Sequence, residues 1–207
     1  MKERYGIDLS KHNRVISFAE ASRSVDFVIL RAGGNFGGYY KDSKFEQYYA
    51  ACKENNIPVG AYYDAGKQFI DEKTGKEYAL HFIKLLEGKK FEYPVYLDIE
   101  VTPLVYKKGI TRAAIAFCKT LEDYGYFAGI YASDISGFKD LLDITQVAQF
   151  SFWVARYGNK PSYVRKYGIW QFTSQGIIPG IVGNVDRDIA YQNFPKIIKG
   201  AKLNGYN

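Results

Sequence analysis

Two acidic residues stand close together near the middle of the chain. Asp98 and Glu100 are separated by Ile99 and follow the apolar run Val95–Leu97. In a β-strand, residues i and i+2 point to the same face, about 6.6 Å apart along the strand. Two carboxyl groups at this spacing resist simultaneous ionisation, so one should keep its proton at neutral pH. Such a pair can perform general acid catalysis, including the hydrolysis of a glycosidic bond.

Other polar and aromatic residues end short apolar runs that we predict to be β-strands. The predicted strands are residues 4–8, 27–31, 59–64, 94–100, 127–131, 152–156, 167–172 and 184–186. Their ends carry Asp8, Arg31, Tyr62, Asp64, Asp98, Glu100, Tyr131, Arg156, Gln171 and Asp186. The carboxyl ends of barrel strands share one face, where active sites collect. We therefore expect these side chains to form one rim.

Amphipathic segments between the strands predict helices over residues 43–55, 74–87 and 111–124, with a weaker candidate at 138–149. Ser43 with Glu46, and Thr74 with Glu77, have the spacing of a capping box at the start of a helix. Gly125 is typical of a position just beyond the end of the third helix.

The alternation of strands and helices predicts an α/β fold, an irregular and flattened β/α barrel. About five β/α units would be closed by three further strands, because the 207-residue chain is shorter than the ~250 residues of a regular barrel. The short spacers near the end of the chain predict loops or hairpins there. The alternative is an open doubly wound sheet, but the first strand is followed by DLSKHN rather than a glycine-rich phosphate turn.

Composition narrows the class of protein. Apolar residues make up 47% and charged residues 24% of the chain, which excludes a disordered protein. The net charge of +6 favours anionic partners, but scattered basic residues without a recognition motif argue against nucleic acid. No apolar run is long enough to insert into a membrane, and the first residues lack the apolar core of a signal peptide.

Metal and nucleophile chemistry have little support in the sequence. Cys52 and Cys118 are isolated, and His12 and His81 have no partner motif. Several carboxylates could hold a hard cation, but the aromatic residues and the absence of a suitably spaced histidine disfavour this. We therefore expect neither a metal nor a cofactor.

Taken in order, several segments resemble the glycoside hydrolase family 25 lysozymes. These segments, between Tyr5 and about Pro195, are YGIDLSKHN, VILRAG, IPVGAYY, FEYPVYLDIE, YFAGIYAS, FWVARY, YGIWQFTSQG and GIVGNVDRDIAY. The resemblance is to endolysin catalytic domains of clostridial-type phages and prophages. It implies a catalytic domain over residues 1–195, with residues 196–207 as a basic tail or the start of a linker.

The resemblance implies hydrolysis of the β-1,4 bond between N-acetylmuramic acid and N-acetylglucosamine in peptidoglycan. Glu100 matches the general acid, and Asp98 matches the carboxylate that orients the 2-acetamido group, whose participation would retain configuration. Asp8 and Asp186 match two further acids. Asp188 is a competing assignment for the last of these, but Asp186 fits the family motif better.

The resemblance also implies a set of substrate-binding residues, Arg31, Tyr62, Tyr131, Trp153 and Gln171. Two places depart from the family: Tyr63-Asp64 at the end of the third strand, and the segment 134–138 after the fifth. These departures concern contacts away from the acid pair.

Two other functions remain open at this stage. A chitinase-like hydrolase would carry four acids on the fourth strand, of which only Asp98 and Glu100 are present. A catalytically silent wall-binding module would have little use for the rim acids. The expected partners are peptidoglycan glycan strands, together with anionic wall polymers. The expected localisation is synthesis in the host cytoplasm and action on the wall after release.

Overall fold

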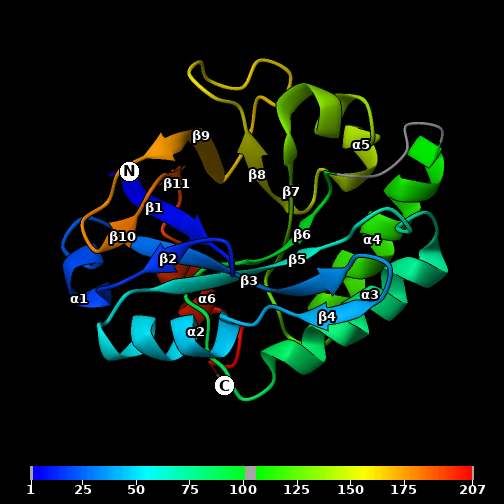
Figure 1. Cartoon of the computed structure of the whole chain (residues 1–207). Coiled ribbons are helices and arrows are strands. Elements are labelled where there is room, and N and C mark those ends of the chain that lie inside the picture. The colour runs from blue at the N-terminus through cyan, green and yellow to red at the C-terminus, as the bar shows by residue number, and fades with distance from the viewer. Residues whose placement is uncertain (1, 101–105, 207) are drawn as a thin grey trace.

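The computed structural model describes residues 2–100 and 106–206 and forms a closed barrel of eight strands with one added strand (Figure 1). In spatial order the barrel strands are β1 (Arg4–Leu9), β11 (Val185–Ala190), β9 (Ile169–Gly176), β8 (Ser151–Ala155), β7 (Ala128–Ser133), β6 (Val95–Asp98), β5 (Val59–Asp64) and β3 (Phe27–Asn35). Pairing of β1 with β3 closes the ring, and β4 (Tyr39–Lys41) extends β3 as a hairpin. The predicted β/α barrel is confirmed.

The late strands close the barrel without regular crossover helices, as the short spacers predict. β8 and β9 pair in parallel, and the loop 156–168 joins them without a helix. β11 pairs antiparallel with both β9 and β1, the only barrel strand in the described residues to run against its neighbours. The small β10 (Ile181–Val182) pairs with β2 (Arg14–Val15) beside the barrel.

Most helices cover the outside of the ring, and the last one, α6 (Phe194–Gly200), closes the end of the barrel at the amino-terminal ends of the strands. The helices are α1 (Phe18–Ala21), α2 (Phe45–Glu54), α3 (Glu72–Leu86), α4 (Lys107–Asp123), the π-helix η2 (Asp134–Lys139), α5 (Ile144–Val147) and α6. The segment predicted as a weak helix over 138–149 divides into the end of η2 and the short α5.

Three predicted helix starts are wrong. α2 begins after Lys44 without a side-chain cap, so Ser43 does not cap it. α3 begins at Glu72, because Asp71 accepts from the Thr74 amide and the Thr74 hydroxyl in turn serves the Asp71 backbone. Thr74 therefore occupies the N3 position of that capping box, its last residue, and not the N-cap position, its first. α4 begins at Lys107, one turn before Thr111.

The apolar side chains form two cores on the two sides of the sheet. The larger lies between the strands and the helices and contains the two buried, free cysteines, Cys52 and Cys118. The smaller fills the barrel interior with aromatic rings, among them Phe27, Tyr96 and Trp153.

Glycines inside the barrel make room for these rings. A Cβ atom on Gly6 would lie 2.4 Å from the Phe27 ring, and one on Gly129 would lie 2.4 Å from Tyr96. Since such distances are far below van der Waals contact, both positions require glycine while the rings keep these places.

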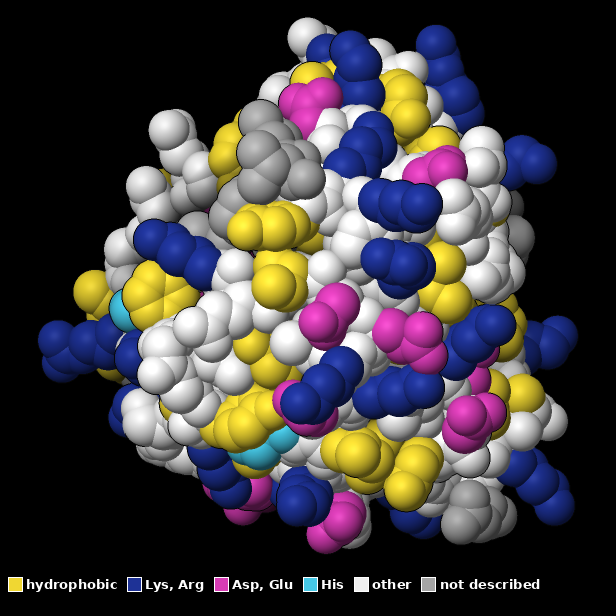
Figure 2. All heavy atoms as spheres, turned by 90° about the vertical axis from the view of Figure 1, so that its right-hand side faces the viewer, with side chains coloured by type: hydrophobic (Ala, Val, Ile, Leu, Met, Phe, Trp, Pro, Cys, Tyr) yellow, Lys and Arg dark blue, Asp and Glu magenta, His cyan; other side chains and the backbone are white. Residues whose placement is uncertain are grey.

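The side of the molecule that carries α3 and α4 displays both signs of charge (Figure 2). Lys and Arg side chains are spread over it, with Asp and Glu side chains between them. Pairs such as Lys76–Glu72 (2.8 Å) and Lys73–Glu77 (3.9 Å) lie one helical turn apart on α3. This is a solvated, mixed surface. None of the described helices is both long and apolar enough to cross a membrane.

Residues 194–206, which include most of the segment offered by the sequence as a basic tail or linker, pack against the amino-terminal ends of the strands. Phe194 and Ile198 of α6 are buried in the barrel core. Asn204 is fully buried, accepts from the Phe127 amide (2.7 Å) and donates to the Phe91 and Tyr93 carbonyls (3.3 and 2.9 Å).

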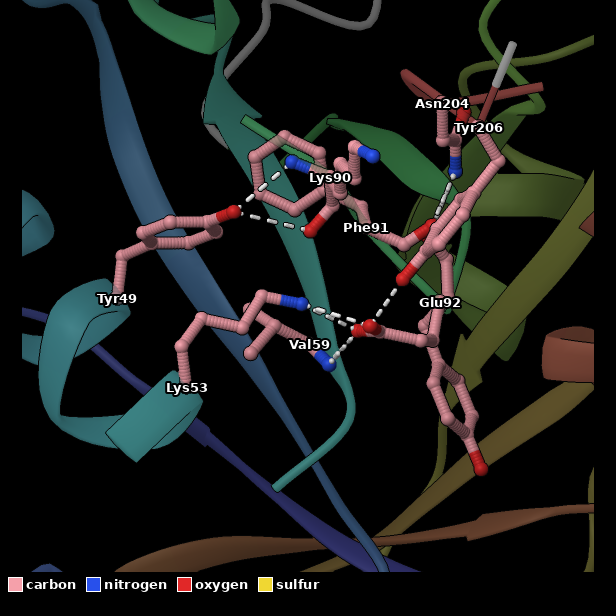
Figure 3. A network of polar contacts seen from close by, with 9 residues as sticks. Tyr49, Lys53, Val59, Lys90, Phe91, Glu92, Asn204 and Tyr206 are labelled. Atoms are coloured by element: carbon pink, nitrogen blue, oxygen red, sulfur yellow. Dashed lines mark hydrogen bonds and ion pairs between the residues drawn. The ribbon is translucent and has the colours of Figure 1, made fainter. Parts of the chain in front are cut away.

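A polar network continues from Asn204 towards α2 (Figure 3). The Tyr206 hydroxyl donates to Glu92, whose carboxylate also pairs with Lys53 (2.7 Å) and accepts from the Val59 amide (3.0 Å). The end of the described chain is thereby tied to a helix and a strand that lie far away in sequence.

Candidate active site

Strand register brings acids from opposite ends of the sequence together at the mouth of the barrel. Asp8 on β1 lies directly opposite Asp186 on β11, and Asp64 on β5 lies opposite Asp98 on β6. Side chains of directly paired residues stand on the same face of a sheet. With Glu100 and Asp188, these residues form what we call the acid cluster.

Glu100 follows the end of β6. The backbone amide of Ile99 still donates to the Tyr131 carbonyl (3.0 Å), as in a strand. The Ile99 side chain is buried and points away from the mouth of the barrel. Asp98 and Glu100 therefore share one side of the chain, as the i, i+2 spacing predicts. Asp98 is 7% exposed, whereas Glu100 is open to solvent. The residues after Glu100, 101–105, lie outside the described part.

A chain of hydrogen bonds links two of the acids across the barrel. Gln171 Nε2 donates to Asp8 Oδ2 (2.8 Å), and the Tyr131 hydroxyl donates to Gln171 Oε1 (2.9 Å). The same hydroxyl lies 3.2 Å from Glu100 Oε1. Since a hydroxyl has one proton, Tyr131 can donate either to Gln171 or to the Glu100 carboxylate, but not to both at once. The Tyr157 hydroxyl adds a further contact to Gln171 Oε1, at 3.3 Å.

The surroundings favour the protonated form of the acids. Desolvation, and then the charges of Glu100 and Asp64, raise the pKa of Asp98 well above its ordinary value. Desolvation, Asp188 and Asp186 do the same for the pKa of Asp8. Partial desolvation raises the pKa of Glu100, the Tyr131 hydrogen bond opposes this, and the charges of Asp64 and Asp186 add to it. Desolvation also raises the pKa of Asp186.

Asp188 is the deepest member of the acid cluster, inside the barrel. It is fully buried, and its Oδ1 accepts from the indole N–H of Trp153 (2.8 Å). Its Oδ2 has no hydrogen-bond partner in the described part of the chain, and desolvation raises its pKa well above the ordinary value. Asp188 supports Trp153 from below, whereas Asp186 stands beside Asp8.

The predicted substrate-binding residues line the same end of the barrel at different depths. Trp153 is 1% and Gln171 2% exposed, and the Tyr131 ring packs 4.3 Å from the Trp153 ring. These three make a buried floor. Tyr62 and Arg31 are more open and come from the neighbouring strands β5 and β3.

Arg31 is held by an ion pair at the base of α2. Its Nε lies 2.8 Å from Asp42 Oδ2, and Asp42 also accepts from the Lys11 and Lys44 amides. Arg31 Nη2 is buried and without a partner among the described residues, as is Asp98 Oδ1. A polar ligand that pairs with an unpaired buried donor and an unpaired buried acceptor relieves their desolvation cost. These two atoms are therefore the places where a hydrogen bond to a ligand adds most to the binding free energy.

Three residues of this site were absent from the predicted catalytic and substrate-binding residues. Asp64 was predicted to lie on the rim, because it ends its strand as Asp98 does, but it was assigned no role and placed among departures from the family. Asp188 was weighed only as a rival to Asp186, yet the two have separate places. Tyr157 belongs to a loop, and no local pattern marks it. No group of three or more His, Cys, Asp or Glu in the described residues is arranged to hold a metal ion.

Comparisons with known proteins show to which family the chain is similar. The family model of the glycosyl hydrolases family 25 matches residues 7–181. The autolytic lysozyme of Clostridium acetobutylicum is 26% identical over 185 residues, 88% of this chain and 54% of that protein. The present chain thus spans about half the length of this curated relative.

Two solved structures share the fold. The CTP1L endolysin superposes with a TM-score of 0.80 at 27% identity, covering 97% of this chain and 70% of that one. The autolysin LytC of Streptococcus pneumoniae, solved with a synthetic peptidoglycan ligand, gives 0.77 at 22% identity, covering 91% and 47%.

The family match extends over most of the chain. Asp8, Asp98 and Glu100 fall inside it, while Asp186 and Asp188 lie a few residues beyond its end. The match to residues 7–181 covers well over half of the chain and includes the acid pair and most of the barrel strands. The chain therefore belongs to the glycosyl hydrolases of family 25.

Proposed function

We propose that the protein is a lysozyme that hydrolyses the β-1,4 bond between N-acetylmuramic acid and N-acetylglucosamine in peptidoglycan. The observation that carries the proposal is the Asp98–Glu100 pair, at the mouth of a family 25 barrel, in surroundings that raise both pKa values. The peptidoglycan ligand of LytC and the name of the clostridial lysozyme support the substrate class.

In the proposed mechanism, Glu100 is the general acid. It donates its proton to the glycosidic oxygen as the bond from this oxygen to C1 breaks, and the neutral sugar leaves. The oxygen of the 2-acetamido group attacks C1 and forms a cyclic oxazolinium ion. The Glu100 carboxylate then removes a proton from water, whose oxygen attacks C1 and reopens the ring with retained configuration.

The other acids support the charge that develops on the sugar. Asp98 accepts from the acetamido N–H, which orients the carbonyl oxygen towards C1 and stabilises the positive charge of the ring. Its unpartnered Oδ1 supports this role. Asp8 and Asp186 stabilise the cation from the side of β1 and β11. Arg31 and Tyr62 bind sugar substituents, above the floor of Tyr131, Trp153 and Gln171.

Product analysis tests the function. Purified Gram-positive peptidoglycan is digested, reduced with borohydride and examined by mass spectrometry, with Glu100→Gln and the distant, exposed Glu54→Gln as a matched control. We expect reduced muramic acid ends with wild type and E54Q, and a rate lowered about 10²- to 10⁴-fold in E100Q. Reduced glucosamine ends would overturn the bond assignment, and equal rates in E100Q would overturn the role of Glu100.

The mechanism has its own test. Direct NMR observation of the first-formed anomer distinguishes retention from inversion, and an inverted product would exclude acetamido participation. A thiazoline analogue of the oxazolinium ion should inhibit competitively.

We further propose that the enzyme acts on the wall after leaving the cytoplasm in which it is made, because its substrate lies outside. Fractionation of producing cells before and during lysis checks this. Wall-bound protein should accumulate only when lysis begins.

A further inference from the structure

A hollow of about 880 Å³ lies on the outer side of the barrel, away from the acid cluster. Phe127, Ser151 and Gly168, which line it, stand at the amino-terminal ends of β7, β8 and β9. A regular barrel would cover this surface with a crossover helix between β8 and β9. Here the loop 156–168 passes without one (Figure 1). The hollow has the size of a ligand site.

Aromatic rings and an unpaired hydroxyl make part of its lining. Tyr167 and Tyr191 meet edge to face with centroids 5.5 Å apart, and Phe127 also lines the hollow. The Tyr191 hydroxyl is buried and has no hydrogen-bond partner among the described residues. Ring faces pack against the C–H surfaces of sugars or polyols, and a free hydroxyl adds a directional hydrogen bond.

The charges of the lining are of one sign. Arg165 and Lys166 are exposed and form no ion pair with any described residue, and no acidic residue lines the hollow. Lys160 Nζ lies 6.0 Å from the centre of the Tyr191 ring. Two acids lie close enough for their charges to raise the pKa of Tyr167 or Tyr191. Asp134, near Tyr167, is buried and paired with Arg156, so Glu3, near Tyr191, is the one acid of the two without that pairing. The α3–α4 side, by contrast, mixes both signs (Figure 2).

The basic segment is fixed in place. Asp134, 2% exposed, accepts from the backbone amides of Ser162 (2.7 Å) and Val164 (2.9 Å), directly before Arg165. The two cations are therefore presented from an anchored loop, which lowers the entropy lost on binding an anion.

We propose that this hollow is an accessory binding site for a cell-wall polymer of sugar or polyol units joined by phosphodiesters. Arg165 and Lys166 bind phosphates, the rings of Tyr167 and Tyr191 pack against the units between them, and the Tyr191 hydroxyl binds one of their oxygens. That the polymer belongs to a cell wall rests on the proposed function. The site holds the enzyme on the wall, separately from the acid cluster that cuts it.

Wall binding by the whole chain tests the site. Pelleting isotherms on purified Gram-positive walls are measured in the E100Q background, which keeps the walls intact. The variants are R165Q/K166Q and Y191F. The matched control is K84Q/K119Q, which removes the same charge from exposed positions on α3 and α4. The soluble probe is purified polyribitol phosphate, titrated calorimetrically, and a second batch of walls has its phosphate polymers extracted with hydrofluoric acid.

We expect R165Q/K166Q to weaken binding to untreated walls and to polyribitol phosphate about tenfold, and Y191F about threefold. The control pair should change either affinity less than twofold. On extracted walls, all variants should bind equally and more weakly. An equal loss of affinity in K84Q/K119Q would show diffuse electrostatic attraction only. A loss of affinity in R165Q/K166Q that persists on extracted walls would show that the ligand of the hollow is not a phosphate polymer. Either result overturns the proposal.

The two proposals fail separately. Reducing-end release from extracted walls by chains with an intact Glu100 reports on cleavage alone. If wild type cannot cut them but the hollow variants still lose polymer binding, the proposed function fails and the accessory site stands.

Discussion

At the scale of single residues, the barrel mouth holds acids that the protein discourages from ionising. Asp8, Asp98 and Asp188 are all buried, and for each of them desolvation is the largest cause of a raised pKa. A raised folded-state pKa means that the folded protein binds the proton more tightly than the unfolded chain. This tighter binding of the proton stabilises the folded protein. The stabilisation is complete at pH values below the ordinary pKa of an aspartate, and it is lost as the pH rises through the folded-state pKa.

Asp188→Asn should therefore stabilise the protein at neutral pH. The amide oxygen can still accept from Trp153, and no buried charge forms as the pH rises. We expect a higher Tm at pH 7–8 by a few degrees, since about 1 kcal/mol corresponds to roughly 2–4 °C at this size. The difference should vanish near pH 4. Thermal unfolding across this pH range checks it, and a variant less stable than wild type at pH 8 would contradict it.

Tyr131→Phe should move the alkaline limb of the activity profile. The Tyr131 hydroxyl lowers the pKa of Glu100 by hydrogen bonding to its carboxylate, so removing it raises that pKa. A general acid works while protonated, so the descending limb should shift to higher pH.

The profile of kcat/KM for Y131F is compared with that of Tyr157→Phe. The Tyr157 hydroxyl contacts Gln171 and not Glu100, so this variant should leave the limb in place. A limb shifted to lower pH in Y131F would refute the assignment of Glu100 as the titrating acid.

At the scale of elements, the π-helix η2 and the helix-free loop 156–168 act as one unit. Asp134 on η2 accepts from Arg156 Nη1 (2.7 Å) and from three successive amides of the loop, Ser162, Tyr163 and Val164. These amides lower the pKa of Asp134 despite desolvation, with Arg156 adding to the effect. One end of the loop carries Tyr157 to the acid cluster, and the other carries Arg165 to the hollow.

Asp134→Asn should loosen this loop. The asparagine lacks the negative charge that pairs with Arg156, and its NH2 group faces the backbone N–H groups of the loop, which need an acceptor. We expect a loss of stability of about 3 kcal/mol. We expect faster proteolysis within residues 156–168, a Tm lowered by several degrees, and kcat/KM reduced about tenfold. The neighbouring, exposed Asp140→Asn should behave like wild type. An uncleaved loop in D134N would show that other contacts hold it.

At the scale of the whole molecule, the end of the described chain secures the end of the barrel opposite the acids. Asn204 has a positive φ of 54° and satisfies backbone groups of residues 91, 93 and 127, which stand at the entries to β6 and β7. Glu92 adds its ion pair with Lys53. The strands that carry the acids at their carboxyl ends are thus fixed at their amino ends.

Asn204→Ala should destabilise the fold more than a surface change in the same turn. It removes three hydrogen bonds and leaves buried backbone groups unpaired, at roughly 2–4 kcal/mol in total. Denaturant unfolding measures the loss. The control is Lys202→Gly, at an exposed position with a φ of 55°, where glycine relieves strain and should be neutral or slightly stabilising. Equal stability of N204A and wild type would contradict this role.

Local sequence patterns were enough to predict the strand–helix alternation, the five β/α units and the shared side of Asp98 and Glu100. These follow from periodicity and i, i+2 geometry, which depend on neighbouring residues only. The predicted helix starts at Ser43 and Thr74 failed because a capping box depends on which polar side chain reaches a free amide, and several nearby residues compete for it.

Tertiary structure alone decided which distant residues meet. Gln171 contacts Asp8 across 163 positions of sequence, and Asp8 faces Asp186 only because β11 closes the barrel antiparallel to β1. The burial of Asp188, the packed end around Asn204 and the hollow left by the missing helix likewise come from barrel closure. Register and desolvation are properties of the closed sheet, so no local pattern contains them.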